Sequence, residues 1–329
     1  MRILAAFTLA GALFAQAPQS SQAVPPADEV PLITADVDVV SILAAVRDKH
    51  NGLVSDLGKG DFTIMEDGKP QTIKYFTRET DLPLTIGLLI DVSRSQENVL
   101  DIERRAAAAF FTQVLQKKDE AFLISFGEES ELLQDFTNSP RLLTNAMNGL
   151  KVSSGVGGLG PGPVPTLGGA AGTVLYDAIY LASNEKLKGE VGRKVIVVIT
   201  DGVDEGSKLK IEDALEAAQK ADTVIYSIDY SDASAYGGFS FGSLGGGYGA
   251  LKRMSEETGG HVFEVDRKHT LDDVFKELQE EMRSQYSIGY TPINDVKDGS
   301  YRKLDIRVKD KTMKVQARKG YYAIKHEAK

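Results

Sequence analysis

Residues 88–99 read LLIDVSRSQENV and place three oxygen-bearing side chains at alternate positions directly after an apolar run. These residues are Asp91, Ser93 and Ser95. Their spacing is compatible with the cap of a helix, with an exposed nucleophile or with a metal site. In an extended loop alternate residues point the same way, so we expect the three side chains to form one concave group.

A second carboxylate is expected beside this group. Asp201 directly follows the apolar run KVIVVIT, just as Asp91 directly follows LTIGLLI. The carboxyl ends of parallel strands meet at one edge of a sheet, which is also where ligands bind in this class of fold. A site made only of carboxylate and hydroxyl oxygens suits Mg²⁺, Mn²⁺ or Ca²⁺, and suits zinc or copper poorly.

The elements that would position these residues form an α/β domain over 83–285. Nearly continuous apolar runs alternate there with amphipathic segments, which predicts a doubly wound, mostly parallel sheet with helices on both faces. One helical stripe consists of Val99, Ile102, Ala106, Phe110 and Val114. The segment ELLQDF follows AFLISF after a short turn, so we expect it to be one antiparallel edge strand.

Two flanking segments, 35–82 and 286–325, show the period-two alternation of β-strands. Each is too small to close a core alone. We therefore expect them to pair into one β-sandwich, with the α/β domain inserted between them. Two separate small β units are the alternative, and they would leave more exposed sheet edges.

The chain begins like an exported protein. Arg2, the apolar run 3–14 and the small residues up to Ala23 predict a signal peptide over 1–23, followed by a proline-containing leader over 24–34. A short membrane anchor is the alternative. The chain has no cysteine, which excludes disulfides and thiolate chemistry. We expect a periplasmic or secreted protein with no membrane span after cleavage.

The net charge of −9 argues against nucleic acid as a partner, because that function needs a concentrated basic face. Lysine and arginine are scattered along the chain, so an anionic membrane surface is not expected either. Two glycine-rich stretches, 153–172 and 231–249, each precede a predicted helix. Flexible linkers are one interpretation; their position inside the α/β domain favours loops at a site.

Several motifs together resemble the von Willebrand factor type A domain. DVSRS matches its Asp-x-Ser-x-Ser signature, AGTVLYDAI resembles its threonine-bearing loop, and VIVVITDGVDEGS resembles its Thr-Asp-Gly segment. The resemblance implies a metal-ion-dependent adhesion site in which a divalent cation, above all Mg²⁺, bridges to an Asp or Glu of a protein partner. Its ligands would be Asp91, Ser93, Ser95, Thr173 and Asp201.

The flanking segments also resemble those of exported bacterial proteins related to this family. Arg94 is a departure, since a small residue is more usual in the middle of the signature. Asp204 and Asp229 are expected in solvent or in supporting roles. Candidate contacts to a partner are Arg94 and the aromatic residues of the second glycine-rich stretch, Tyr236, Phe239, Phe241 and Tyr248.

Each proposed ligand also has a purely structural interpretation. Ser95 could cap a helix that begins near Glu97, Thr173 could cap the next helix, and Asp201–Gly202 is an ordinary turn pair. Two motif matches are rejected. Gly238–Gly242 fits the esterase pattern and Gly155–Gly160 the dinucleotide pattern, but both lack the required strand, turn and helix.

Three functions remain compatible with the sequence. The first is a metal-dependent protein-binding or adhesion module that is not an enzyme. The second is a structural scaffold of the cell envelope whose metal site has lost its function. The third is a metal-assisted hydrolase, which would need a general base near the ion; no histidine is placed there by the sequence.

Overall fold

A six-stranded, mostly parallel sheet forms the centre of the α/β domain, in the order β10-β9-β8-β5-β6-β7. The computed structural model describes residues 39–78, 82–93, 96, 100–152, 172–230 and 247–324. Only β7 runs antiparallel to its neighbour. The predicted fold, including the antiparallel edge strand, is confirmed. The strands are β5 (Leu84–Asp91), β6 (Glu120–Phe126), β7 (Ser130–Thr137), β8 (Arg193–Thr200), β9 (Thr223–Asp229) and β10 (Val262–Glu264).

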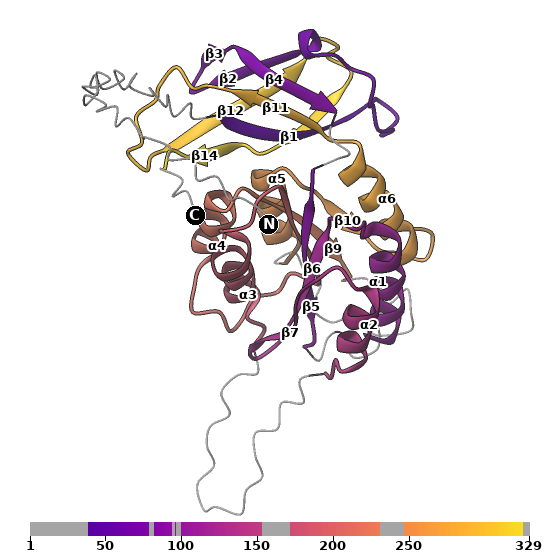
Figure 1. Cartoon of the computed structure of the whole chain (residues 1–329). Coiled ribbons are helices and arrows are strands. Elements are labelled where there is room, and N and C mark those ends of the chain that lie inside the picture. Colours follow the sequence, from indigo (N-terminus) through magenta and orange to yellow (C-terminus); the bar gives the residue numbers. More distant parts are fainter. Residues whose placement is uncertain are drawn as a thin grey trace, which may run out of the picture. The chain divides into compact units, whose positions relative to one another are not determined.

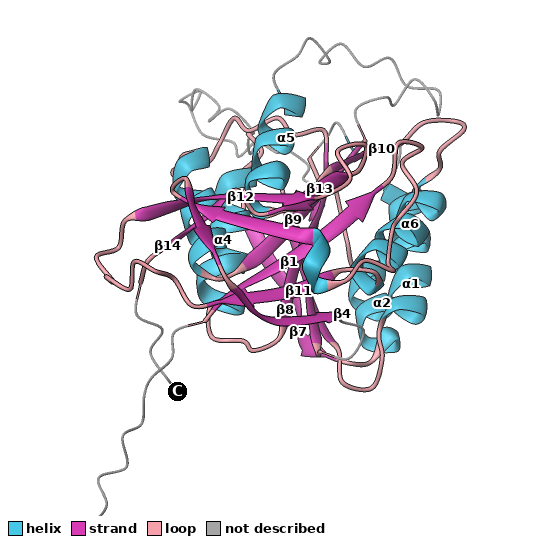
Figure 2. Ribbon diagram, turned by 90° about the horizontal axis from the view of Figure 1, so that it is seen from above, coloured by secondary structure: helices cyan, strands magenta, loops and turns pink. Residues whose placement is uncertain are grey.

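Helices cover both faces of this sheet, which explains why its central strands are apolar along their whole length. Every residue of β5 and β8 is buried. Figure 1 shows α1, α2 and α6 on one face and α3 and α4 on the other, and Figure 2 shows α1, α2 and α6 opposite α4 from above. The helices are α1 (Leu100–Val114), α2 (Pro140–Asn148), α3 (Leu175–Leu181), the π-helical η3 (Ala182–Leu187), α4 (Ile211–Lys220), α5 (Gly247–Thr258) and α6 (Leu271–Arg283).

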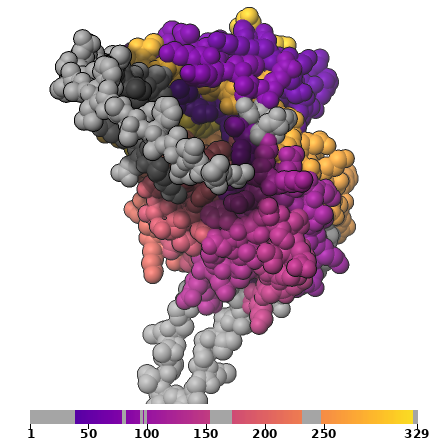
Figure 3. Space-filling model, in the orientation of Figure 1, coloured from indigo at the N-terminus to yellow at the C-terminus, as the bar shows by residue number. Residues whose placement is uncertain are grey.

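The N- and C-terminal β segments combine into two four-stranded antiparallel sheets, β13-β1-β11-β4 and β14-β12-β2-β3. Each sheet contains strands from both segments, and the two share one apolar core. The expected β-sandwich is therefore present. Figure 3 shows indigo N-terminal and yellow-orange C-terminal residues side by side at the top of the molecule. Its elements are β1 (Val40–Arg47), η1 (Lys59–Asp61), β2 (Phe62–Glu66), β3 (Lys69–Gln71), β4 (Ile73–Arg78), β11 (Tyr286–Tyr290), β12 (Tyr301–Val308), β13 (Lys314–Ala317) and β14 (Gly320–Tyr322).

The sandwich and the α/β domain share a buried polar contact at Glu281 of α6. This side chain is fully buried. It pairs with Arg47 of β1 and accepts a hydrogen bond of 2.6 Å from Gln316 of β13. Burial alone would raise the pKa of Glu281, but the hydrogen bond and charge of His261 and the charge of Arg47 lower it. Asp38–Lys329 accordingly form one unit.

Some predicted segments lie outside the described residues. These include the signal peptide over 1–23, the leader over 24–34 and most of both glycine-rich stretches. Within the described ranges, no helix is both long and apolar enough to cross a membrane.

Gly87 on β5 is required by the packing of Phe122, the residue opposite it on β6. A Cβ atom at Gly87 would lie 2.4 Å from Cζ of Phe122, whereas one at Gly60 would meet nothing within 4 Å. We therefore expect Gly87→Ala to lower the free energy of unfolding by about 1–3 kcal/mol through overpacking. Urea unfolding measures this, with Gly60→Ala as the matched control. Equal stability of the two variants would contradict the packing described here.

Candidate metal centre

Asp91 ends β5, and its side chain is completely buried. Two donors fix its carboxylate. The Thr200 hydroxyl donates to Oδ2 at 2.6 Å, and the Ser93 backbone N–H donates to Oδ1 at 2.9 Å. Thr200 in turn accepts from the Gly202 N–H at 3.1 Å. The carboxylate therefore has one defined orientation at the carboxyl end of the sheet.

Asp201 lies on the neighbouring strand end, directly after β8. Strands β5 and β8 pair in parallel with Ile90 opposite Ile199, so the two aspartates follow adjacent, aligned strands. The strand that follows β5 along the chain, β6, lies on one side of the β5–β8 pair. The strand that follows β8, β9, lies on the other side. This reversal is a topological switch point, the usual ligand position in a doubly wound sheet. This arrangement agrees with the prediction that Asp91 and Asp201 lie at the same edge of the sheet.

The loop around Asp201 is tightly constrained. The Val203 N–H donates to Asp201 Oδ1 at 3.1 Å. Gly202 has φ +79°, and a Cβ atom there would lie 2.6 Å from the Gly247 carbonyl oxygen. The first residue of α5 thus packs directly against this turn, so the end of the second glycine-rich stretch lies at the candidate site.

Thr173 lies in a second loop that is bonded to the first. It is 9% exposed, and its carbonyl oxygen accepts from the Glu205 and Gly206 N–H groups, each at 3.1 Å. Asp204 also has a structural role here, because its Oδ1 accepts from the Tyr176 N–H at 3.2 Å and from the Ser207 hydroxyl at 2.5 Å. The expected supporting role of Asp204 is therefore to tie the Asp201 loop to the start of α3.

The structure describes some of the remaining predicted residues, and others lie outside the ranges it describes. Ser93 is half-buried beside Asp91, and Asp229, at the end of β9, is buried. Tyr248 is 41% exposed in the first turn of α5, next to the Gly247 that contacts the Asp201 loop. A hydrogen bond with Glu264 raises the pKa of Tyr248. Ser95, Arg94, Tyr236, Phe239 and Phe241 lie outside the described residues.

Two buried polar residues of this domain were not predicted. Thr200 orients Asp91 but reads in the sequence as the last residue of an apolar strand. Glu103 is fully buried on α1, and both of its carboxyl oxygens lack a hydrogen-bond partner in the part of the chain that the structure describes. A signal for Glu103 does exist in the sequence, because it falls within the buried stripe Leu100, Ala107 and Phe111.

Burial raises the pKa of two carboxyl groups, those of Asp91 and Glu103. It raises the pKa of Asp91 to about 6, the charge of Asp201 contributes in the same direction, and the hydrogen bonds from Thr200 and Ser93 oppose it. Burial raises the pKa of Glu103 well above its usual range, and the charge of Asp91 adds to this. None of Asp91, Asp201 and Glu103 forms an ion pair with a described basic residue.

These features fit a hard divalent cation. Buried carboxylates without basic partners are costly, and a cation at the rim would offset their charge. No group of three or more His, Cys, Asp or Glu side chains in the described ranges is arranged to hold a metal. The predicted set does not depend on such a group, because it combines two carboxylates with hydroxyl oxygens. The donors present suit Mg²⁺, Mn²⁺ or Ca²⁺.

Comparison with known families agrees with this fold. Residues 86–203 match the model of the von Willebrand factor type A domain. The chain contains a von Willebrand factor type A domain. The match covers β5 from Ile86 onward, all of β8 and the residues Asp91, Thr173 and Asp201. A comparison with curated proteins finds no match.

Three solved structures are similar to this chain. BatB from Bacteroides thetaiotaomicron is 16% identical, with a TM-score of 0.45 over 60% of this chain and 97% of that chain. The type A domain of the type V pilus tip protein Mfa5 from Porphyromonas gingivalis is 12% identical, with a TM-score of 0.46 over 62% and 96%. Proximal thread matrix protein 1 from the mussel byssus, with zinc in its MIDAS motif, is 15% identical, with a TM-score of 0.48 over 66% and 49%.

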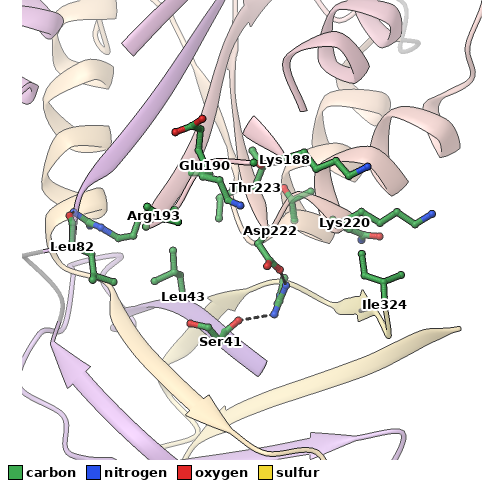
Figure 4. A pocket seen from close by; sticks show the side chains of 18 of the residues that line it. Ser41, Leu43, Leu82, Lys188, Glu190, Arg193, Lys220, Asp222, Thr223 and Ile324 are labelled. Atoms are coloured by element: carbon green, nitrogen blue, oxygen red, sulfur yellow. Dashed lines mark hydrogen bonds and ion pairs between the residues drawn. The ribbon is translucent and has the colours of Figure 1, made fainter. Parts of the chain in front are cut away.

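A cleft of about 1090 Å³ lies at the opposite edge of the sheet, where β8 and β9 begin (Figure 4). Residues of both the type A domain and the sandwich line it. Its buried Lys194 is desolvated, which lowers the pKa of the amine, while the charges of Asp222 and Glu190 act in the opposite direction. None of the predicted metal ligands that the structure describes lines this cleft.

The raised pKa of Asp91 predicts a pH-dependent stability of the metal-free type A domain. Its folded value of about 6 lies above the ordinary 3.8, so its contribution is present below pH 4 and is lost as pH rises through 6. A rise of this size corresponds to about 3 kcal/mol. We expect the free energy of unfolding of the metal-stripped protein, relative to Asp91→Asn, to fall by up to that amount between pH 4 and pH 7. Urea titrations of both proteins test this, and a constant difference would refute it.

Proposed function

We propose that this chain is an exported protein-binding module, without enzymatic activity, whose type A domain binds Mg²⁺ or a similar divalent cation and, through it, an acidic side chain of a protein partner. One observation carries the proposal. Asp91 and Asp201 follow adjacent parallel strands at a topological switch point, and the buried Asp91 is held in one orientation with no described basic partner.

Each predicted ligand would have a distinct role. Asp91 and Asp201 supply the negative charge, while Ser93, Ser95 and Thr173 add neutral hydroxyl oxygens. A cation held by so little protein charge stays electron-poor, and a bound ion of this kind attracts a carboxylate from outside. The hydrogen bonds from Thr200 and the Ser93 N–H keep Asp91 in place. This ligand is therefore already ordered before a cation binds.

The surface around the site suits recognition of a protein. Tyr248 exposes 41% of its surface next to the Asp201 loop. Aromatic side chains supply large contact areas at a low entropic cost. Arg94, Tyr236, Phe239 and Phe241 are proposed as further contacts from the sequence alone. Arg94 would pair with an acidic partner segment.

Export and the absence of catalysis are parts of the same proposal. The start of the chain has the charged, apolar and small-residue regions of a signal peptide. A metal-assisted hydrolase needs a general base near the ion. Both histidines of the α/β domain have other neighbours, since His261 lies 3.5 Å from Glu281 and His269 bonds to Glu264 and Glu277.

Binding of Mg²⁺ to the purified full-length chain is the first test of this proposal. We expect isothermal titration calorimetry to show one site in the wild type and none in Asp201→Asn, because the variant loses one of two carboxylate ligands. The amide oxygen of the substituted side chain can still accept from the Val203 N–H, so the turn is retained. Asp272→Asn, an exposed charge-matched change on α6, should bind as the wild type does. Equal binding by Asp201→Asn would refute the site.

Partner capture tests the second half of the proposal. A crosslinked pull-down from envelope and medium should recover a protein with the wild type in Mg²⁺, and not with the wild type in EDTA or with Asp201→Asn. The same proteins in all three samples would place binding outside the metal site. Mg²⁺ binding without any captured protein would favour the scaffold, and turnover of a substrate that chelation abolishes would favour the hydrolase.

A further inference from the structure

The cleft between the type A domain and the sandwich contains a nearly buried lysine. Lys194 is the second residue of β8, and only 8% of its surface is exposed. Successive residues of a strand point to opposite faces of the sheet. Lys194 therefore lies on the same face as Ile196 and Val198, which pack in one apolar cluster with α3 and α4. A valine or isoleucine at this position would avoid the cost of removing an amine from water.

The side chain of Lys194 forms no hydrogen bond or ion pair with any residue that the structure describes. The carboxylate of Asp222 pairs instead with Arg318, whose guanidinium also donates to the Ser41 carbonyl oxygen of the sandwich at 2.6 Å. Burial lowers the pKa of Lys194, and the charges of Asp222 and Glu190 act in the opposite direction. The amine is thus open to a further anionic partner, which would favour its charged form.

The cleft around Lys194 is predominantly basic. Among the described residues that line it, five are basic and two are acidic. The basic ones are Lys188, Arg193, Lys194, Lys220 and Arg318. This local excess of positive charge contrasts with the net charge of −9 of the whole chain. The lining therefore favours a ligand of negative charge.

Apolar side chains from both domains complete the cleft. Leu43 and Ile324 line it from the sandwich, and Val224 lines it from β9. Figure 4 shows Leu43 and Ile324 on the opposite side of the cleft from Lys188 and Glu190. The volume of about 1090 Å³ is close to the upper end of the range of small-molecule sites. Such sites combine apolar walls with a few charged groups that orient the ligand.

We propose that this cleft binds a small organic anion, a carboxylate or phosphate compound with an apolar portion, and that Lys194 holds its charged group. The apolar portion would rest against Leu43, Val224 and Ile324. Lys194 precedes Asp201 by seven residues along β8, which corresponds to roughly 20 Å of extended strand. The anion site is therefore separate from the proposed metal site and does not depend on it.

Ligand-observed NMR titrations of the full-length chain in metal-free buffer test this inference. The probes are phenyl phosphate, benzoate and benzamide, the uncharged isostere of benzoate. A pH of 6.5 lies four units below the ordinary lysine pKa of 10.5 and so favours the charged amine. We expect at least one of the two anions to bind and benzamide not to bind. The anion that binds more tightly identifies the charged group, carboxylate or phosphate, that the cleft prefers.

Substitutions at Lys194 locate the binding. Lys194→Met keeps the length of the side chain and removes its charge, so it should weaken anion binding about tenfold to 100-fold. Lys194→Arg keeps the charge and should retain most of the affinity. Lys311→Met removes an exposed charge from the turn between β12 and β13, and should bind the anion as the wild type does.

A further variant tests the opposite wall of the cleft. Leu43→Glu adds a carboxylate at a half-buried position on the sandwich, and should abolish anion binding while leaving β8 unchanged. Thermal unfolding without a probe shows which variants retain the fold. If Lys194→Met does not fold, Leu43→Glu decides the test, and wild-type affinity in that variant would overturn the inference.

The remaining outcomes separate this inference from the proposed function. A wild type that binds neither anion, or that binds benzamide as tightly as benzoate, would overturn the anion site. Equal Kd values for the wild type and a folded Lys194→Met variant would overturn it as well. Anion binding that depends on Lys194, in a chain that binds no Mg²⁺, would support the anion site and overturn only the proposed function.

Discussion

The carboxylate of Asp91 is withdrawn completely from solvent at the end of a central strand, where it accepts hydrogen bonds from the next strand and from its own loop. A buried carboxylate is unfavourable unless it is paired, and no described basic residue pairs with it. The neighbouring loops are arranged around this constraint. Thr200 bonds to both Asp91 and Gly202, so the orientation of the carboxylate and the course of the Asp201 loop depend on one hydroxyl group.

The same constraint extends outward through the backbone. The Thr173 carbonyl oxygen bonds to the Asp201 loop, Asp204 bonds to the start of α3, and Gly247 packs against the turn at Gly202. Four chain segments far apart in sequence therefore meet at the rim, in a rigid arrangement rather than as independent loops. Rigid support of this kind is what a ligand site requires, because its groups must hold their geometry before the ligand arrives.

The two fully buried glutamates of this fold that lie on α1 and α6 differ in their partners. Glu281 joins the type A domain to the sandwich, and its basic and amide partners offset the cost of its burial. Glu103 is buried in the first turn of α1, and neither of its carboxyl oxygens has a hydrogen-bond partner among the described residues. The cost of burying the Glu103 carboxyl group is therefore not offset by any described partner.

The order and types of the elements followed from the sequence, because apolar periodicity and strand length report how each segment is buried. The alternation around 83–285, the single antiparallel edge strand and the pairing of the two β flanks were all predictable in this way, as was the position of Asp91 and Asp201 at the ends of parallel strands, which the structure shows to be adjacent. Periodicity does not report which polar atoms find partners. The hydrogen bond from Thr200 to Asp91, the bond from the Tyr176 N–H to Asp204 and the burial of Glu103 without a described partner arise only when distant segments pack together, so only the tertiary structure decided them.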